Sequence, residues 1–225
     1  MSSEQDETGG TILKLVEAIA ITPQDARAVV SQYERQARQA RPDSTNEAVR
    51  TLVIKKVIGR YSRLAATSGG VTSLAGIVPG VGTAVTMIGG GLADVSICMK
   101  LQIDMTMCLA IAINGKITNE DAKHMSFVIA LAGTLEKFGT KAGQNTVSKA
   151  AVKVASSYLT GATLITIKQL AKQVGIEFTK RAAVKAIPFG IGVVVGSSAN
   201  YILTRYVGAL ARDVLLLECK SLAVT

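Results

Sequence analysis

Tryptophan is missing from this 225-residue chain, which also has only one histidine and three cysteines. A single imidazole argues against a histidine-based metal centre, which needs several such ligands. Three cysteines exclude a scaffold held together by disulfides. Disorder is excluded as well, because only 18% of the residues are charged and the mean hydropathy is +0.35. The sequence therefore predicts a folded chain with a sizeable core.

Basic residues are absent from the first ten positions, which read MSSEQDETGG and carry three acids. A secretory signal has a basic amino-terminal region, and an organellar transit peptide is poor in acids. We therefore expect residues 1–10 to be a disordered acidic tail on a cytoplasmic protein. Residues 11–225 are expected to form one helical domain.

Most of the chain has the periodicity of α-helices. One helix begins at Thr22-Pro23, with threonine as the N-cap and proline at the first helical position, and extends to about Arg41. Others are expected after Asp43 and from Asn119 to about Phe138. No convincing alternating segment bounded by hairpin turns indicates a strand. The expected fold class is all-α.

Charge disappears completely over residues 64–93, a run of thirty residues with eight glycines. Its length would allow a membrane span. However, proline removes a helical hydrogen bond and glycine accepts a tight turn. We therefore expect a helix corner at Pro79, Gly80 and Gly82, after which a second apolar helix extends to Asn114-Gly115.

A weaker copy of this pattern follows at residues 187–192, with the sequence IPFGIG. It predicts a second helix corner at Pro188, Gly190 and Gly192. The predicted architecture is thus a compact single domain with two Pro-Gly-broken apolar helices at its centre.

Motifs for catalysis or cofactor binding are incomplete. The loop over 76–83 lacks the lysine that a phosphate-binding loop places before its final threonine. His124 lies three residues after Asp121, which is the spacing of a surface pair, and no nucleophile elbow accompanies it. Cys98 and Cys108 are ten residues apart, which is not a metal-ligand spacing, so we interpret them as small buried residues. The sequence predicts no metal, no cofactor and no catalytic residue.

Three charges interrupt the apolar stretch over 67–115, namely Asp94, Lys100 and Asp104. Lys100 and Asp104 are four residues apart and can pair along one helix. In a membrane such charges would be functional by default. The spacing favours a structural ion pair.

Positive charge is concentrated over residues 137–185, where nine bases accompany one acid, Glu177. Eight of these bases form i, i+4 pairs: Lys137/Lys141, Lys149/Lys153, Lys168/Lys172 and Arg181/Lys185. Nucleic acid is an unlikely partner, because aromatic residues are few and lysine far exceeds arginine. Lysine beside an apolar stripe is typical of a helix on an anionic membrane surface. A merely solvated face remains an alternative.

Residues 162–186 predict a helix with two different sides. The side expected to face the core carries Leu164, Ile167, Val174 and Phe178. The exposed side is expected to form a docking surface from Lys168, Lys172, Arg181 and Lys185.

Two segments resemble the EcsC family of bacterial proteins. The first has GIVPGVGT, then GLAD, then Leu101-Gln102, and the second has IPFGIG, then Asn200, Arg205 and Ala211-Arg212. The resemblance extends over about residues 22–215, although Asn114-Gly115 replaces an expected Tyr-Gly-like helix end. It implies a helical protein that is membrane-associated or transporter-linked and has no established catalytic residues.

We therefore expect a non-enzymatic membrane-associated or adaptor protein that docks through its basic helices. Its partner would be an anionic membrane surface or an acidic protein, and its place would be the cytoplasm or the inner membrane. Two alternatives remain open. The hairpin over 64–114 could insert as an anchor or pore, or an apolar cavity could bind a lipid or another small molecule.

Overall fold

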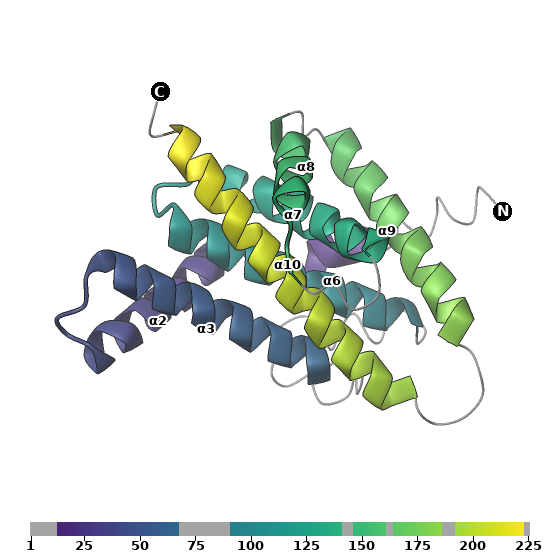
Figure 1. The fold of residues 1–225 in the computed structure, drawn as a ribbon, viewed down its shortest axis with the longest axis horizontal. Coiled ribbons are helices and arrows are strands. Elements are labelled where there is room, and N and C mark those ends of the chain that lie inside the picture. Colours follow the sequence, from purple (N-terminus) through teal and green to yellow (C-terminus); the bar gives the residue numbers. More distant parts are fainter. Residues whose placement is uncertain (1–12, 68–90, 141–145, 161–163, 186–191, 223–225) are drawn as a thin grey trace.

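The computed structural model places helices close to where the sequence patterns predict them. It describes residues 13–67, 91–140, 146–160, 164–185 and 192–222. No strand occurs among these residues, which confirms the all-α fold class. After a short helix over 13–19, the helices are α2 (Pro23–Ala40), α3 (Asn46–Thr67), α6 (Gly91–Ile113), α7 (Asn119–Gly139), α8 (Lys149–Thr160), α9 (Leu164–Lys185) and α10 (Gly192–Leu222) (Figure 1).

Two of these helices start with the same threonine cap. The Asp25 amide donates to Thr22 Oγ1 at 3.1 Å, and the Thr22 hydroxyl donates to the Asp25 carboxylate at 2.7 Å. Thr118 and Asp121 repeat both bonds, at the same distances, where α7 begins. Each cap satisfies a backbone N–H that has no partner within the helix, and the acid stabilises the first turn. The sequence correctly predicted the first cap and the start of α7 at Asn119, but it did not identify Thr118 as the second cap.

Helix α6 is at the centre of the bundle and contacts α2, α3, α7 and α10. Every residue over 96–111 is buried, as expected for a helix that is apolar on all sides. Among the described residues it is the one helix long and apolar enough to cross a membrane, over Ser96–Ile113 with mean hydropathy 1.5. In this fold 94% of that window is buried against other helices, so protein rather than lipid surrounds it.

Helix α10 is the second apolar helix and packs on α3, α6 and α7. The predicted corner residues Pro79, Gly80, Gly82, Pro188 and Gly190 lie outside the described residues. Gly192, the remaining one, is the first residue of α10, while α9 ends at Lys185. The two helices thus stop and start on either side of the predicted second corner.

Arg27 of α2 holds the turn between α6 and α7. Its guanidinium donates to the Ile117 carbonyl at 2.5 Å, and to the Gly115 carbonyl and Asn119 Oδ1 at 3.3 Å each.

Arg27→Met keeps an unbranched apolar side chain but removes these donors, so we expect a loss of about 1–2 kcal/mol in the free energy of unfolding, measured in urea. Arg35→Met on the exposed side of the same helix is the control and should cost less than about 0.5 kcal/mol. If both variants lost the same free energy of unfolding, the Arg27 hydrogen bonds would make no net contribution to stability.

Candidate functional site

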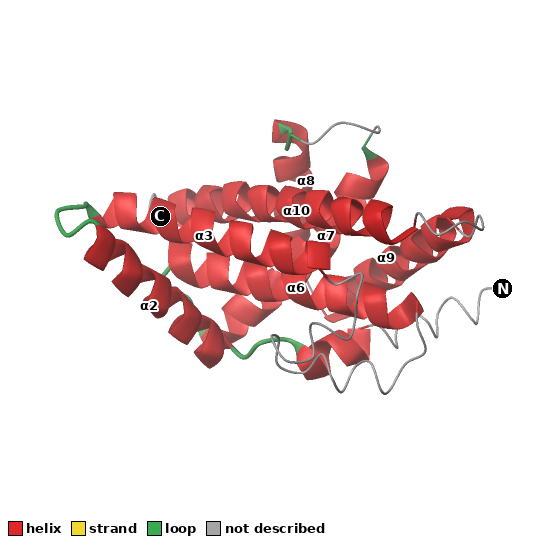
Figure 2. Cartoon of the chain, turned by 90° about the horizontal axis from the view of Figure 1, so that it is seen from below, coloured by secondary structure: helices red, strands yellow, loops and turns green. Residues whose placement is uncertain are grey.

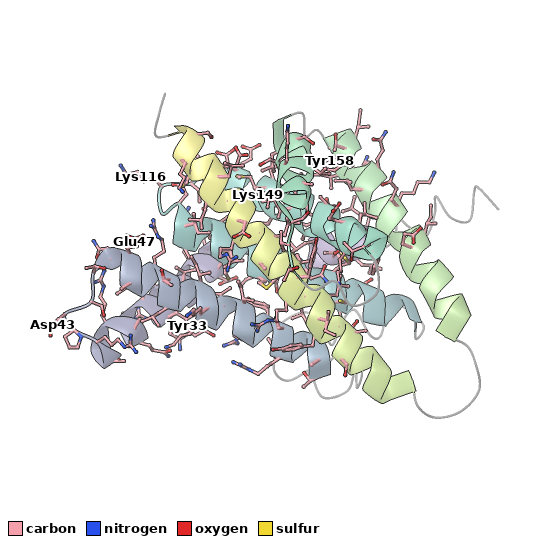
Figure 3. The ribbon with its side chains drawn as sticks, viewed as in Figure 1. Tyr33, Asp43, Glu47, Lys116, Lys149 and Tyr158 are labelled. Carbon is pink, nitrogen blue, oxygen red and sulfur yellow. The ribbon has the colours of Figure 1, made fainter. Side chains whose placement is uncertain are left out.

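Large apolar side chains are exposed where α8 ends and α9 begins. Leu164 and Ile165 in the first turn of α9 are 58% and 67% exposed, and Val154 and Tyr158 of α8 are 46% and 37% exposed. Figure 3 shows Tyr158 beside the junction of the two helices, and Figure 2 shows α8 standing out beyond α10. These four are most of the six exposed large apolar residues in the described part of the chain.

Exposed lysines accompany this apolar cluster. Lys149 and Lys153 lie one turn apart on the exposed side of α8, and Lys168 lies one turn after Leu164 in α9. The one acid in these two helices, Glu177, is half-buried and lies about two and a half turns after Lys168. We use the name α8–α9 face for these exposed residues of the two helices taken together, namely Lys149, Lys153, Val154, Tyr158, Leu164, Ile165 and Lys168.

The structure describes the side chains of two of the four bases predicted to form a docking surface. Lys168 is exposed and Lys172 is half-buried. Arg181 and Lys185 belong to α9, but their side chains lie outside the description. At roughly 100° per residue, Arg181 falls about 220° around the helix axis from Lys168. Arg181 therefore lies on a different side of α9 from Lys168, and we do not include it in the α8–α9 face.

The predicted apolar stripe of α9 is correct in part. Ile167 and Val174 are buried, and the side chain of Phe178 lies outside the description. Leu164 was predicted to face the core, and that prediction is wrong. Burial starts at Ile167, one turn into the helix, so the first turn extends beyond the core. The signal that could have revealed the face is Ile165, an apolar residue on the same side of the helix as Lys168.

A second feature is a pocket of about 610 Å³ between residues 18–22, α2, α3 and α6. Lys100 and Asp104 of α6 line it and form the ion pair that their spacing predicts, with Nζ 2.5 Å from Oδ2. Each residue is only 2% exposed. The other carboxylate oxygen, Asp104 Oδ1, accepts the backbone N–H of Ile21 at 2.8 Å. The pair therefore also fastens the segment before α2 to the central helix.

Burial dominates the electrostatics around this pocket. It raises the pKa of Asp104, an effect that the Lys100 ammonium and the Ile21 N–H oppose. It also raises the pKa of Tyr61 well above its ordinary value and that of Cys108 to about 12. The Tyr61 hydroxyl lies 3.8 Å from Cys108 Sγ. Both groups keep their protons at neutral pH, and an un-ionised thiol is a poor nucleophile.

The other residues considered for chemistry are the three cysteines and His124. Cys98 and Cys108 are buried, as predicted, and Cys219 is half-buried. His124 is half-buried in the first turns of α7. Within the described ranges, no group of histidine, cysteine, aspartate or glutamate is arranged to hold a metal ion.

Comparison with protein-family models, curated proteins and solved structures finds no match to this chain. The α8–α9 face and the pocket are therefore interpreted from their own chemistry.

Proposed function

We propose that this is a non-enzymatic protein that docks on an anionic membrane surface through the α8–α9 face. The observation that carries the proposal is that two consecutive helices, α8 and α9, expose four large apolar side chains and three lysines. Anionic lipids attract each lysine near the surface by about 1 kcal/mol. Apolar side chains such as Leu164 and Ile165 gain further free energy by entering the head-group region. If the face were only solvated, these apolar side chains would stay in water and nothing would offset the unfavourable free energy of their hydration.

Peripheral docking fits the fold better than insertion of the 64–114 hairpin. The described part of that hairpin is almost wholly buried against other helices. Exposing it to lipid would separate α6 from α2, α3, α7 and α10. The proposed location is accordingly the cytoplasmic side of the inner membrane. The resemblance to the EcsC family points in the same direction and itself remains a prediction.

Flotation with liposomes tests the proposal. The native chain should float with vesicles of phosphatidylcholine and phosphatidylglycerol at low salt, and much less with phosphatidylcholine alone. The triple variant Lys149→Glu, Lys153→Glu, Lys168→Glu reverses the charges of the face. It should weaken binding by about 100-fold, because each reversed lysine loses about 1 kcal/mol of attraction and gains repulsion. Ile165→Ser should reduce the part of the binding that persists at high salt.

A control variant distinguishes an effect of the α8–α9 face from an effect of the protein's net charge. Lys55→Glu, Lys116→Glu and Lys123→Glu change the charge by the same six units at exposed positions on α3, on the α6–α7 turn and on α7. This variant should bind anionic vesicles several-fold more tightly than the face variant. Equal weakening in both would show that overall charge, and not the α8–α9 face, drives binding. Failure of the native chain to bind either vesicle would instead favour an acidic protein partner.

A further inference from the structure

In the pocket between residues 18–22, α2, α3 and α6, the cationic side chains have hydrogen-bond donors to spare, whereas the carboxylates already have partners. An ammonium can donate three hydrogen bonds, but among the described residues Lys100 donates one, to Asp104, although Lys100 is only 2% exposed. A guanidinium can donate five, and Arg60 makes one, from Nη1 to the Tyr33 hydroxyl at 3.2 Å. Within the described part of the chain, both cations that line the pocket therefore have N–H groups without a protein acceptor.

The carboxylates that line the same pocket are already engaged. Asp104 accepts from Lys100 with one oxygen and from the Ile21 N–H with the other. The Asp25 carboxylate accepts from the Thr22 hydroxyl. A ligand that supplies further donors or a cation would find few free acceptors here. A ligand that supplies acceptors could bond to the buried Lys100 ammonium and to the exposed Arg60 guanidinium, and charge-assisted bonds of this kind are the stronger ones.

The remaining walls of the pocket are apolar. They include Ile19, Val29 and Leu64. The volume of about 610 Å³ is in the range of pockets that hold small organic ligands, which are mostly apolar with a few polar groups that fix orientation. The occupant should accordingly combine an acceptor head group with an apolar body.

We propose that this pocket binds a carboxylate-terminated acyl chain, with the carboxylate between Arg60 and Lys100 and the chain along the apolar walls. The site is independent of membrane docking, because none of its residues belongs to the α8–α9 face. The ligand chemistry is that of a free long-chain fatty acid, whether it comes from solution or from a membrane.

Fluorescence of cis-parinaric acid, a polyene fatty acid, tests the proposal with the full-length protein. Its emission should rise saturably as protein is added, at probe concentrations where it does not form micelles, and unlabelled palmitate should displace it. Arg60→Gln should weaken binding by about tenfold, since it removes a charge-assisted bond at an exposed position. Hexadecanol, which has the same chain length and no carboxylate, should displace the probe at least tenfold less well.

Two matched controls tie the effect to the pocket. Arg63→Gln changes an exposed arginine of α3 that does not line it, and should bind as the native chain does. Ala28→Trp places a large ring on the exposed lining of the pocket and should abolish binding, whereas Ala40→Trp at the end of α2 should not. Circular dichroism would verify that each variant is folded. The proposal is overturned if the native chain gives no saturable signal, if Arg60→Gln and Arg63→Gln behave alike, or if hexadecanol competes as well as palmitate.

The same assay distinguishes this site from the docking face. The triple lysine variant of the α8–α9 face should keep its affinity for cis-parinaric acid while losing its affinity for anionic vesicles. Loss of both in that variant would mean that the fatty acid binds at the face, which would overturn the pocket assignment.

Discussion

Lys100→Met is expected to lower the free energy of unfolding by about 3–5 kcal/mol, because it leaves the Asp104 carboxylate buried without its cation. The two residues are each 2% exposed, so water cannot replace the lost partner. Equilibrium unfolding in urea at neutral pH measures the loss. A cost below about 1 kcal/mol, typical of an exposed pair, would show that the site opens to water.

A double-mutant cycle separates the pair from the packing around it. Asp104→Asn keeps an oxygen that can accept the Ile21 N–H but removes the charge, so it should also destabilise by stranding Lys100. The combination of Lys100→Met with Asp104→Asn contains no buried charge. We therefore expect it to be more stable than the sum of the single changes by about 1–3 kcal/mol. Simple additivity would contradict a direct interaction.

The loss in the free energy of unfolding caused by Lys100→Met should become smaller at acidic pH. Burial raises the folded-state pKa of Asp104 above its ordinary value, and Lys100 opposes that rise. Without Lys100 the folded pKa rises further, so the folded variant binds a proton more tightly than the unfolded chain does. Its stability relative to the native chain then falls as the pH increases through that pKa and recovers as the pH decreases. Urea unfolding at about pH 4.5 and pH 7 would show this, and a penalty that does not depend on pH would contradict it.

The helices could be predicted from the sequence because the contacts that stabilise them join residues close together along the chain. The cap at Thr22 and the pairing of Lys100 with Asp104 both involve residues three or four positions apart, so spacing alone is informative. The bond from Ile21 to Asp104 joins residues 83 positions apart, and no local pattern records it. The pocket depends on that bond and on the packing of α2 and α3 beside α6, so it could not be predicted from the sequence.

The exposed start of α9 was missed for a different reason. Helical periodicity identifies the side of a helix that is apolar, but it does not tell how far along its length a neighbouring helix covers it. Leu164 continues the stripe of Ile167 and Val174 and is nonetheless 58% exposed, because coverage begins only with the second turn. The composition of the α8–α9 face could therefore be recognised in the sequence, but its position in the fold could not.

Gly208→Val is expected to destabilise the fold by about 3 kcal/mol, through overpacking where α10 crosses α3 and α6. A Cβ atom at Gly208 would lie 3.0 Å from Met105 Sδ and 3.1 Å from both Cγ1 and Cγ2 of Ile58. The methionine can rotate away, but Ile58 is β-branched and has little rotamer freedom in a helix. The close contact with Ile58 could therefore be relieved only if α10 moved outward from α3 and α6.

A pair of alanine variants tests this with opposite expected signs. Gly59 is also inside a helix, and a Cβ there would meet only the Arg63 guanidinium, whose nearest atom, Nη1, lies at 3.5 Å, an ordinary contact. Gly59→Ala should thus raise the free energy of unfolding by about 0.5–1 kcal/mol, the usual gain in helix propensity. Gly208→Ala makes the same backbone gain but should lower stability by about 1–2 kcal/mol, because overpacking outweighs propensity. If both variants were stabilised equally in urea, α10 would have room to shift, and the close approach of the helices would not depend on the missing side chain.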